Sequence, residues 1–266
     1  MYALLKNFSK LPLRFIQNLA KSVGSLLYIT NSSIRRTTEI NLGIAYPELS
    51  ASERTRLAKR SVQSQCMTYA ESVKIWGSEP EFALKQIRNI HHPEIFTDAL
   101  KNPNGTLAVV PHFGTWELLN AWVNQHTSPV IMYKPSKNPD VDRFMLEARQ
   151  RLNATLVPTD ETGVRALFKH LKQGGFAAIL PDHVPKESGG IYSPFYGQNA
   201  LSSTLLSKLA AKTQCSVIGL SCLRHDDLNG FDIHVTELST DILSKDLQLS
   251  VDTLNKEMER MINIAP

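Results

Sequence analysis

The second half of the chain alternates short apolar runs with segments in which apolar residues recur every three or four positions. The apolar runs have the length of buried strands, and they lie at residues 107–110, 129–133, 154–157, 176–180, 216–222 and 231–237. The segments with helical spacing lie at residues 116–122, 139–152, 163–172, 201–212 and 251–264. Because strands alternate with helices, we predict an α/β fold whose mainly parallel central sheet is flanked by helices.

Residues 4–29 have a different pattern, in which apolar side chains recur at helical spacing and Lys6, Lys10 and Arg14 follow a separate face. Pro12 is expected to kink or split this helix. Arg14 and Lys21 interrupt every apolar window of the roughly 18 residues that a membrane-spanning helix needs. A basic amphipathic helix in the membrane interface fits better, and an ordinary amphipathic helix packed on the core is the alternative. We therefore divide the chain into this helix at residues 1–30 and a single α/β domain at residues 31–266.

The formal net charge of +4 is unevenly distributed along the chain. Residues 1–40 carry six Lys or Arg residues and one Glu, whereas residues 226–266 carry nine Asp or Glu residues and three Lys or Arg residues. A groove for nucleic acid would need basic residues in several elements. The basic front end therefore indicates an anionic membrane surface as a partner, and we predict no nucleic-acid binding.

Metal and disulfide sites are not indicated by the sequence. The three cysteines have no paired spacing, which argues against a zinc cluster or a disulfide framework. His91 and His92 precede Pro93, but no further ligands are spaced around them, so this segment is predicted to be a loop. We predict no metal site and no cofactor.

The most informative stretch is the change from strand to helix around His112. Pro111 cannot continue a central strand, and Thr115 has the position of an N-cap, so Pro111 to Gly114 should form an elbow. Glu117 falls in the first turn of the helix, where the helix dipole favours a carboxylate. Glu117 could accept a hydrogen bond from one ring nitrogen of His112 and leave the other nitrogen free as a base. A capping histidine and a dipole-stabilising glutamate are the structural alternative.

Other polar residues follow the predicted strands. Lys134 and Asp182, like His112, come directly after the carboxyl end of a strand, where ligands of parallel sheets bind. Arg149 and Arg151 lie on the helix before the next strand, and an arginine there could meet a phosphate or a developing oxyanion. These residues are predicted to converge on one cleft.

The segment from His112 to Glu117, HFGTWE, resembles the His-x4-acid motif of the lysophospholipid acyltransferase superfamily. Together with RRTTEINLGIAYPELSASER upstream and LPDHVPKESGGIYSPFYG downstream, it is similar to the bacterial lipid A late acyltransferases (lauroyl or myristoyl type). In the downstream block His183 stands where that family usually has Gln.

The resemblance implies transfer of a fatty acyl chain from acyl carrier protein to a hydroxyl of a lipid A precursor, at the cytoplasmic face of the bacterial inner membrane. It implies that His112 is the general base and that Glu117 orients it. Arg149 matches the phosphate or oxyanion position better than Arg151 does. The predicted substrate-binding residues are Lys134, Arg149, Arg151, Asp182 and His183.

Three alternatives remain open on the sequence. The acceptor could be another membrane glycolipid. The same His112 and Glu117 could activate water, which would make the protein a thioester or ester hydrolase. The protein could also be a non-catalytic membrane-associated binding protein in which the elbow has only a structural role.

Overall fold

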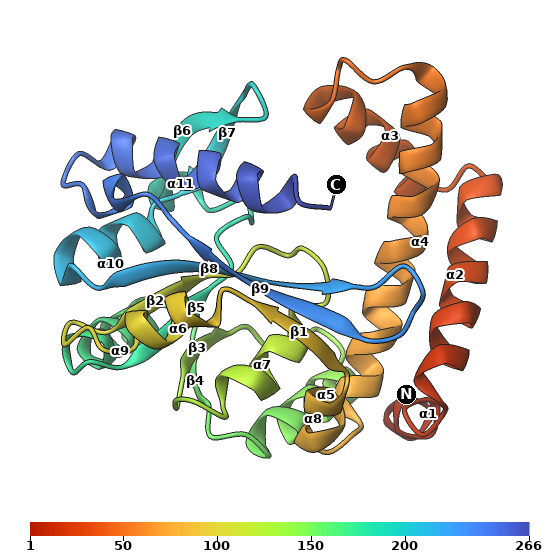
Figure 1. Ribbon diagram of the computed structural model, residues 1–266, viewed down its shortest axis with the longest axis horizontal. Helices are drawn as coiled ribbons and strands as arrows, with labels where there is room; N and C mark the ends of the chain where they lie inside the picture. The colour runs from red at the N-terminus through yellow and green to blue at the C-terminus, as the bar shows by residue number, and fades with distance from the viewer. Residues whose placement is uncertain (266) are drawn as a thin grey trace.

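The computed structural model of the chain describes residues 1–265, and its centre is a seven-stranded sheet in the order β1-β9-β8-β2-β5-β3-β4 (Figure 1). Neighbouring strands are parallel except for the antiparallel pair β8 and β9. The strands are β1 (Ile87–His91), β2 (Thr106–Val109), β3 (Val130–Tyr133), β4 (Thr155–Pro158), β5 (Phe176–Ile179), β8 (Ser216–Arg224) and β9 (Phe231–Glu237). The predicted α/β fold with a mainly parallel central sheet flanked by helices is confirmed.

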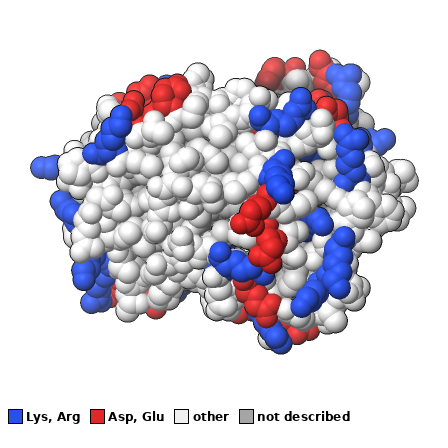
Figure 2. All heavy atoms as spheres, turned by 60° about the horizontal axis from the view of Figure 1, so that its bottom comes forward, with Lys and Arg blue, Asp and Glu red and all other residues white. Residues whose placement is uncertain are grey.

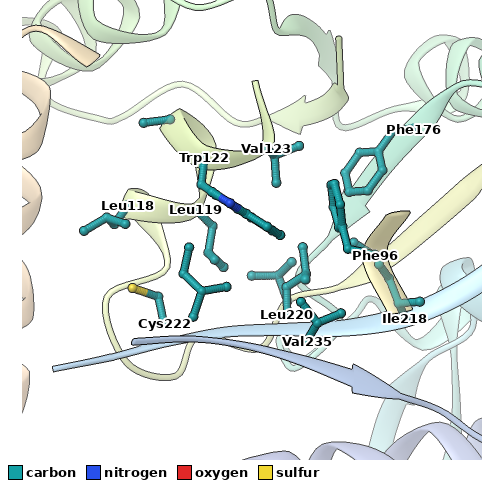
Figure 3. Packing of buried hydrophobic residues seen from close by; sticks show 14 of the residues in the cluster. Phe96, Leu118, Leu119, Trp122, Val123, Phe176, Ile218, Leu220, Cys222 and Val235 are labelled. Atoms are coloured by element: carbon teal, nitrogen blue, oxygen red, sulfur yellow. The ribbon is translucent and has the colours of Figure 1, made fainter. Parts of the chain in front are cut away.

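Helices cover both faces of the sheet because successive residues of a strand point to opposite faces. Leu107 and Val109 of β2 pack with α9 (Glu161–Lys172), α10 (Leu205–Thr213) and α11 (Leu247–Ile262). Ala108 of β2 belongs to the other cluster, with α5 (Pro80–Lys85), α6 (Pro93–Ala99) and α7 (Glu117–Val123). Figure 3 shows the interior of this second cluster, in which Trp122 of α7 lies near Phe96 of α6.

Four helices precede the sheet: α1 (Tyr2–Phe8), α2 (Leu13–Ile29), α3 (Ser33–Ala45) and α4 (Ala51–Trp76). Pro12 separates α1 from α2, as expected from its fixed backbone angle. Ser50 and Glu53 cap α4 reciprocally, and α2 lies along α4 (Figure 1). Gly24 permits this approach, since a Cβ there would lie 2.7 Å from Cα of Gln63. α8 (Pro139–Gln150) packs against α1 and α4.

Within residues 1–265, no helix has both the length and the apolar character that crossing a membrane would require. Large apolar side chains are nevertheless exposed along one stripe of α2. Its members are Phe15, Leu19, Val23, Leu26 and Ile29. The face of the molecule in Figure 2 carries charged side chains most densely over the half where α1 and α2 lie in Figure 1, and a broad uncharged area lies over the other half.

Two segments have a different secondary structure from the one predicted. The helix expected from residue 201 begins at Leu205, because the preceding residues form a hairpin of β6 (Gly190–Phe195) and β7 (Gln198–Ser203). Asn255 of α11 fixes this hairpin, since its side-chain amide donates to Ser193 Oγ at 3.0 Å and to Ser202 Oγ at 2.7 Å. His91 was expected in a loop and instead ends β1, where it pairs with His234 of β9. Two short 3-10 helices, η1 (Glu187–Gly189) and η2 (Thr240–Leu243), complete the described elements.

Candidate active site

The elbow after β2 is held against the neighbouring strand β8 by backbone contacts. The amide of Thr115 donates to the carbonyl of Cys222 at 2.7 Å, and Gly114 forms a bridge with the same residue. Gly114 has a φ of +65°, and a Cβ at this position would lie 2.1 Å from the Cys222 carbonyl oxygen. Only glycine fits both the backbone angle and the space. The path of the chain just after His112 is therefore fixed.

His112 is held by Asp182, which follows β5. Nδ1 of the imidazole lies 2.8 Å from Oδ1 of Asp182, and the His112 amide donates to Oδ2 at 2.7 Å. An ionised carboxylate can only accept, so Nδ1 carries the hydrogen and Nε2 has a free lone pair. The rings of Trp116 and His112 pack in a T-shaped arrangement, with centroids 5.2 Å apart. The arrangement gives His112 one tautomer and one orientation.

The hydrogen bond with Asp182 also makes His112 a stronger base. The hydrogen bond to Asp182 raises the pKa of His112 above its usual 6.5, partial burial opposes this rise, and the charges of Asp182 and Glu117 add to it. The side chain of His112 is still 47% exposed. A base that is both oriented and accessible can take a proton from a bound hydroxyl.

Glu117 does not form the expected hydrogen bond with His112; among residues 1–265, Asp182 takes that place. The carboxylate of Glu117 is buried and accepts from Trp76 Nε1 at 2.9 Å and from Arg149 Nη2 at 3.2 Å. The reason is that the first turn of α7 directs Glu117 toward α4 and α8, whereas the elbow holds His112 next to the end of β5. His112 and Glu117 are therefore close together in the sequence motif, but their side chains have different hydrogen-bond partners.

A buried network behind the elbow was not predicted. Glu71 of α4 is fully buried and accepts from Thr115 Oγ1 at 2.8 Å, from Gln17 Nε2 at 2.7 Å and from the guanidinium of Arg224. Thr115 is thus not the N-cap of α7, which is Trp116 without a side-chain cap. The ion pair joins α4 to β8, and the hydrogen bonds from Gln17 and Thr115 join α2 and the elbow to the same carboxylate. Its one sequence signal is that Glu71 stands among the apolar residues Met67, Val73 and Trp76 of α4.

A large groove opens in front of His112, with α3 and α4 on one side and the end of α11 and the β8–β9 connection on the other. It encloses about 1310 Å³, which exceeds the ~300–1,000 Å³ of ordinary small-molecule sites. Its apolar lining includes Leu42, Leu57, Met67, Phe113, Trp116 and Ile262. Polar side chains such as Arg60, Gln63 and Asp232 also line the groove, so it has room for a long acyl chain beside His112 and for polar groups of a substrate.

The remaining predicted site residues do not converge on this groove. Arg149 and Arg151 line a separate small cavity together with Glu117, and Arg151 donates to the carbonyls of Trp76 and Ser78. Lys134 is exposed after β3 and has no hydrogen bond or ion pair to residues 1–265. His183 is exposed and its Nδ1 lies 3.1 Å from the Leu180 carbonyl oxygen. The expected single cleft is therefore reduced to His112 and Asp182.

Comparison with known proteins gives the family. The family described as bacterial lipid A biosynthesis acyltransferase matches residues 1–266. The lipid A biosynthesis lauroyltransferase of Escherichia coli K12 is 24% identical over 267 residues, which cover 100% of this chain and 81% of that protein. The myristoyltransferase of the same organism is 21% identical and covers 96% of this chain and 79% of its own length. The acyltransferase of Haemophilus influenzae Rd is 22% identical and covers 85% of this chain and 72% of its own length. The chain therefore belongs to the bacterial lipid A biosynthesis acyltransferase family and is an acyltransferase of lipid A biosynthesis.

Proposed function

We propose that the protein transfers a fatty acyl chain from acyl carrier protein to a hydroxyl of a lipid A precursor, a secondary acylation in lipopolysaccharide biosynthesis, with His112 as general base. The observation that carries the proposal is His112, held by Asp182, in the wall of a large groove whose lining is partly apolar. The proposed location is the cytoplasmic face of the bacterial inner membrane, where a soluble acyl donor and a lipid acceptor meet.

The reaction requires two proton transfers, one from the acceptor hydroxyl to His112 and one from His112 to the leaving thiolate. Nε2 of His112 takes the proton of the acceptor hydroxyl while the hydroxyl oxygen forms a bond to the thioester carbonyl carbon. The carbon–sulfur bond then breaks, and the leaving thiolate takes the proton from His112, which restores the neutral imidazole. The carboxylate of Asp182 stabilises the imidazolium that exists between these two events, because it accepts the hydrogen of Nδ1 throughout.

Glu117 contributes to the same base at longer range. Its charge raises the pKa of His112, although its own hydrogen bonds go to Trp76, Asn120 and Arg149. The ion pair with Arg149 holds the first turn of α7 against α8. In this proposal Glu117 is a positioning residue, and Asp182 has the orienting role that the motif assigned to Glu117.

The lipid substrate lies in the membrane, and we propose that the exposed apolar stripe of α2 binds the membrane surface. The exposed stripe from Phe15 to Ile29 on α2 faces away from α4, and the exposed cations Lys10, Arg14 and Arg36 lie near its two ends. An apolar stripe flanked by cations is the pattern of a helix that lies in the interface of an anionic bilayer.

Acylation of lipid A tests the proposal directly. Mass spectrometry of lipid A from cells with and without the protein should show an added chain, and the mass difference gives its length. Purified His112→Ala should lose about 10²- to 10⁴-fold in transfer while its circular dichroism is unchanged, because the His112 side chain is half exposed. His126→Ala, which removes an exposed imidazole after α7, is the matched control.

The same assay separates the alternatives. An added chain on a different glycolipid, with lipid A unchanged, would redirect the proposal to another acceptor. Release of free fatty acid at the rate of transfer would indicate water as the acceptor. Near wild-type transfer by His112→Ala would exclude His112 as the base.

A further inference from the structure

Two histidines and an aspartate come together at the edge of the sheet. His91 of β1 pairs in register with His234 of β9, and Asp232 lies two residues earlier on β9, so its side chain is on the same face as His234. The rings of His91 and His234 stack with centroids 4.3 Å apart and an interplanar angle of 17°. One nitrogen or oxygen atom of each of the three residues lies within 4.8 Å of those of the other two.

The Asp232 carboxylate is oriented from behind. The amide and the side-chain Nδ2 of Asn89 donate to its Oδ1 at 3.2 and 2.9 Å, and Nε2 of His225 lies 2.8 Å from the same oxygen. Its other oxygen, Oδ2, lies 3.1 Å from Nε2 of His91. One oxygen is therefore anchored by surrounding groups while the other points at the imidazoles, an arrangement in which outer hydrogen bonds fix a carboxylate ligand.

We propose that His91, Asp232 and His234 bind a divalent transition-metal ion of the zinc class. Imidazole nitrogen and carboxylate oxygen are the ligands such ions take, at about 2.0–2.2 Å. Two ligand atoms on a tetrahedral ion of this size lie roughly 3.4 Å apart, close to the separation of His91 and Asp232. The half-exposed ring of His91 can rotate to complete the site.

The proposed metal site lies in the wall of the groove that contains His112. Asp232 and His234 line the same groove as His112, together with His225. An ion with three protein ligands keeps a position for water or for an anionic group lying in the groove. The site lies on other strands than the pair of His112 and Asp182, so the proposal does not depend on the proposed reaction.

Zinc titration of the full chain, stripped of metal by chelator, tests the site. Isothermal calorimetry with zinc chloride, checked by elemental analysis after dialysis, should give one ion per chain. His91→Asn, His234→Asn and Asp232→Asn should each weaken binding by more than the roughly 10- to 100-fold lost when an outer hydrogen-bond partner is removed. Cobalt(II) should give visible absorption bands with the wild-type chain and lose them with His91→Asn.

His92→Asn is the matched control, since it removes the neighbouring imidazole by the same substitution. His92 bonds only Glu94 among residues 1–265 and has a φ of +58°, which asparagine accepts. It should bind zinc as the wild type does. Absence of stoichiometric zinc binding by the wild type, or equal binding by His91→Asn and His92→Asn, would overturn the proposal. Should His234→Asn fail to fold, the exposed His91 variant and the cobalt spectrum decide the question.

Discussion

One carboxylate determines both the position and the protonation of the His112 imidazole. The Asp182 carboxylate accepts hydrogen bonds from the backbone amide and from Nδ1 of His112, so the imidazole cannot rotate without breaking the hydrogen bond at Nδ1. The same two contacts place negative charge beside Nδ1 and raise the pKa of His112. Changes at Asp182 should therefore alter the pH dependence of the reaction as well as its rate.

We expect Asp182→Asn to lower kcat by about 10²-fold or more and to shift the acidic limb of the pH–rate profile to lower pH. Only neutral His112 acts as a base, and the wild-type rate falls as pH drops through the raised pKa. Asparagine can still accept from Nδ1 but carries no charge, so the imidazolium is less favoured and the pKa falls. An acidic limb that stays in place in Asp182→Asn would contradict this assignment.

A pair of substitutions can distinguish the contribution of Glu117 to folding stability from its contribution to the transfer reaction. Glu117→Gln leaves Arg149 without its partner at a site where the two side chains are only 7% and 15% exposed, so unfolding should cost about 3 kcal/mol less. The double variant Glu117→Gln with Arg149→Met should recover most of this loss in urea titrations. Restored stability together with unrestored transfer would assign Glu117 an effect on His112 beyond holding the elbow. Unchanged stability of Glu117→Gln would show that the ion pair is not important for folding.

At the scale of elements, the elbow depends on the close approach of β2 and β8. Gly114→Ala should destabilise the protein by more than the about 1–2 kcal/mol that a left-handed alanine costs, because its Cβ would also meet the Cys222 carbonyl. Gly197→Ala is the control, since Gly197 has a φ of +72° and nothing within 4 Å of an added Cβ. Equal unfolding midpoints of the two variants would mean that the close approach of Gly114 to the Cys222 carbonyl does not add to the cost of the alanine.

The α2 stripe is best tested by substitution, because deletion of residues 1–30 would also remove Gln17, a partner of the buried Glu71. Leu19→Ser with Leu26→Ser should weaken sedimentation with vesicles of anionic phospholipid by roughly tenfold per residue. Leu249→Ser removes a side chain of similar exposure on α11 and should leave vesicle binding unchanged. Equal binding by all three proteins would exclude the stripe as the docking surface.

For the molecule as a whole, local patterns predicted most elements, whereas contacts between distant segments could not be predicted. The runs around Val109 and Ile179 identify two strands, but only the sheet order makes them neighbours in register. His112 and Asp182 each stand three residues beyond this pair, so their contact follows from a pairing that periodicity does not encode. The spacing of Glu117 from His112 was visible in the sequence, and it suggested the wrong partner.

The same limit applies to the β6–β7 hairpin, the Glu71 network and the cluster at His91. Leu201 fits a helical or an extended pattern equally well, and its pairing with Tyr192 determines the outcome. Glu71 is a plausible surface residue until Arg224, distant along the chain, is placed beside it. His91 lacks ligands nearby in sequence because Asp232 and His234 arrive through the pairing of β1 with β9.

The sheet register holds the reacting pair, whereas much of the groove wall comes from α3, α4 and the end of α11. These two parts of the protein can therefore diversify independently. Substitutions at Leu42, Leu57 or Ile262 can reshape the space available to an acyl tail without moving the base, so chain-length preference can change among descendants of one ancestor while the reaction stays the same.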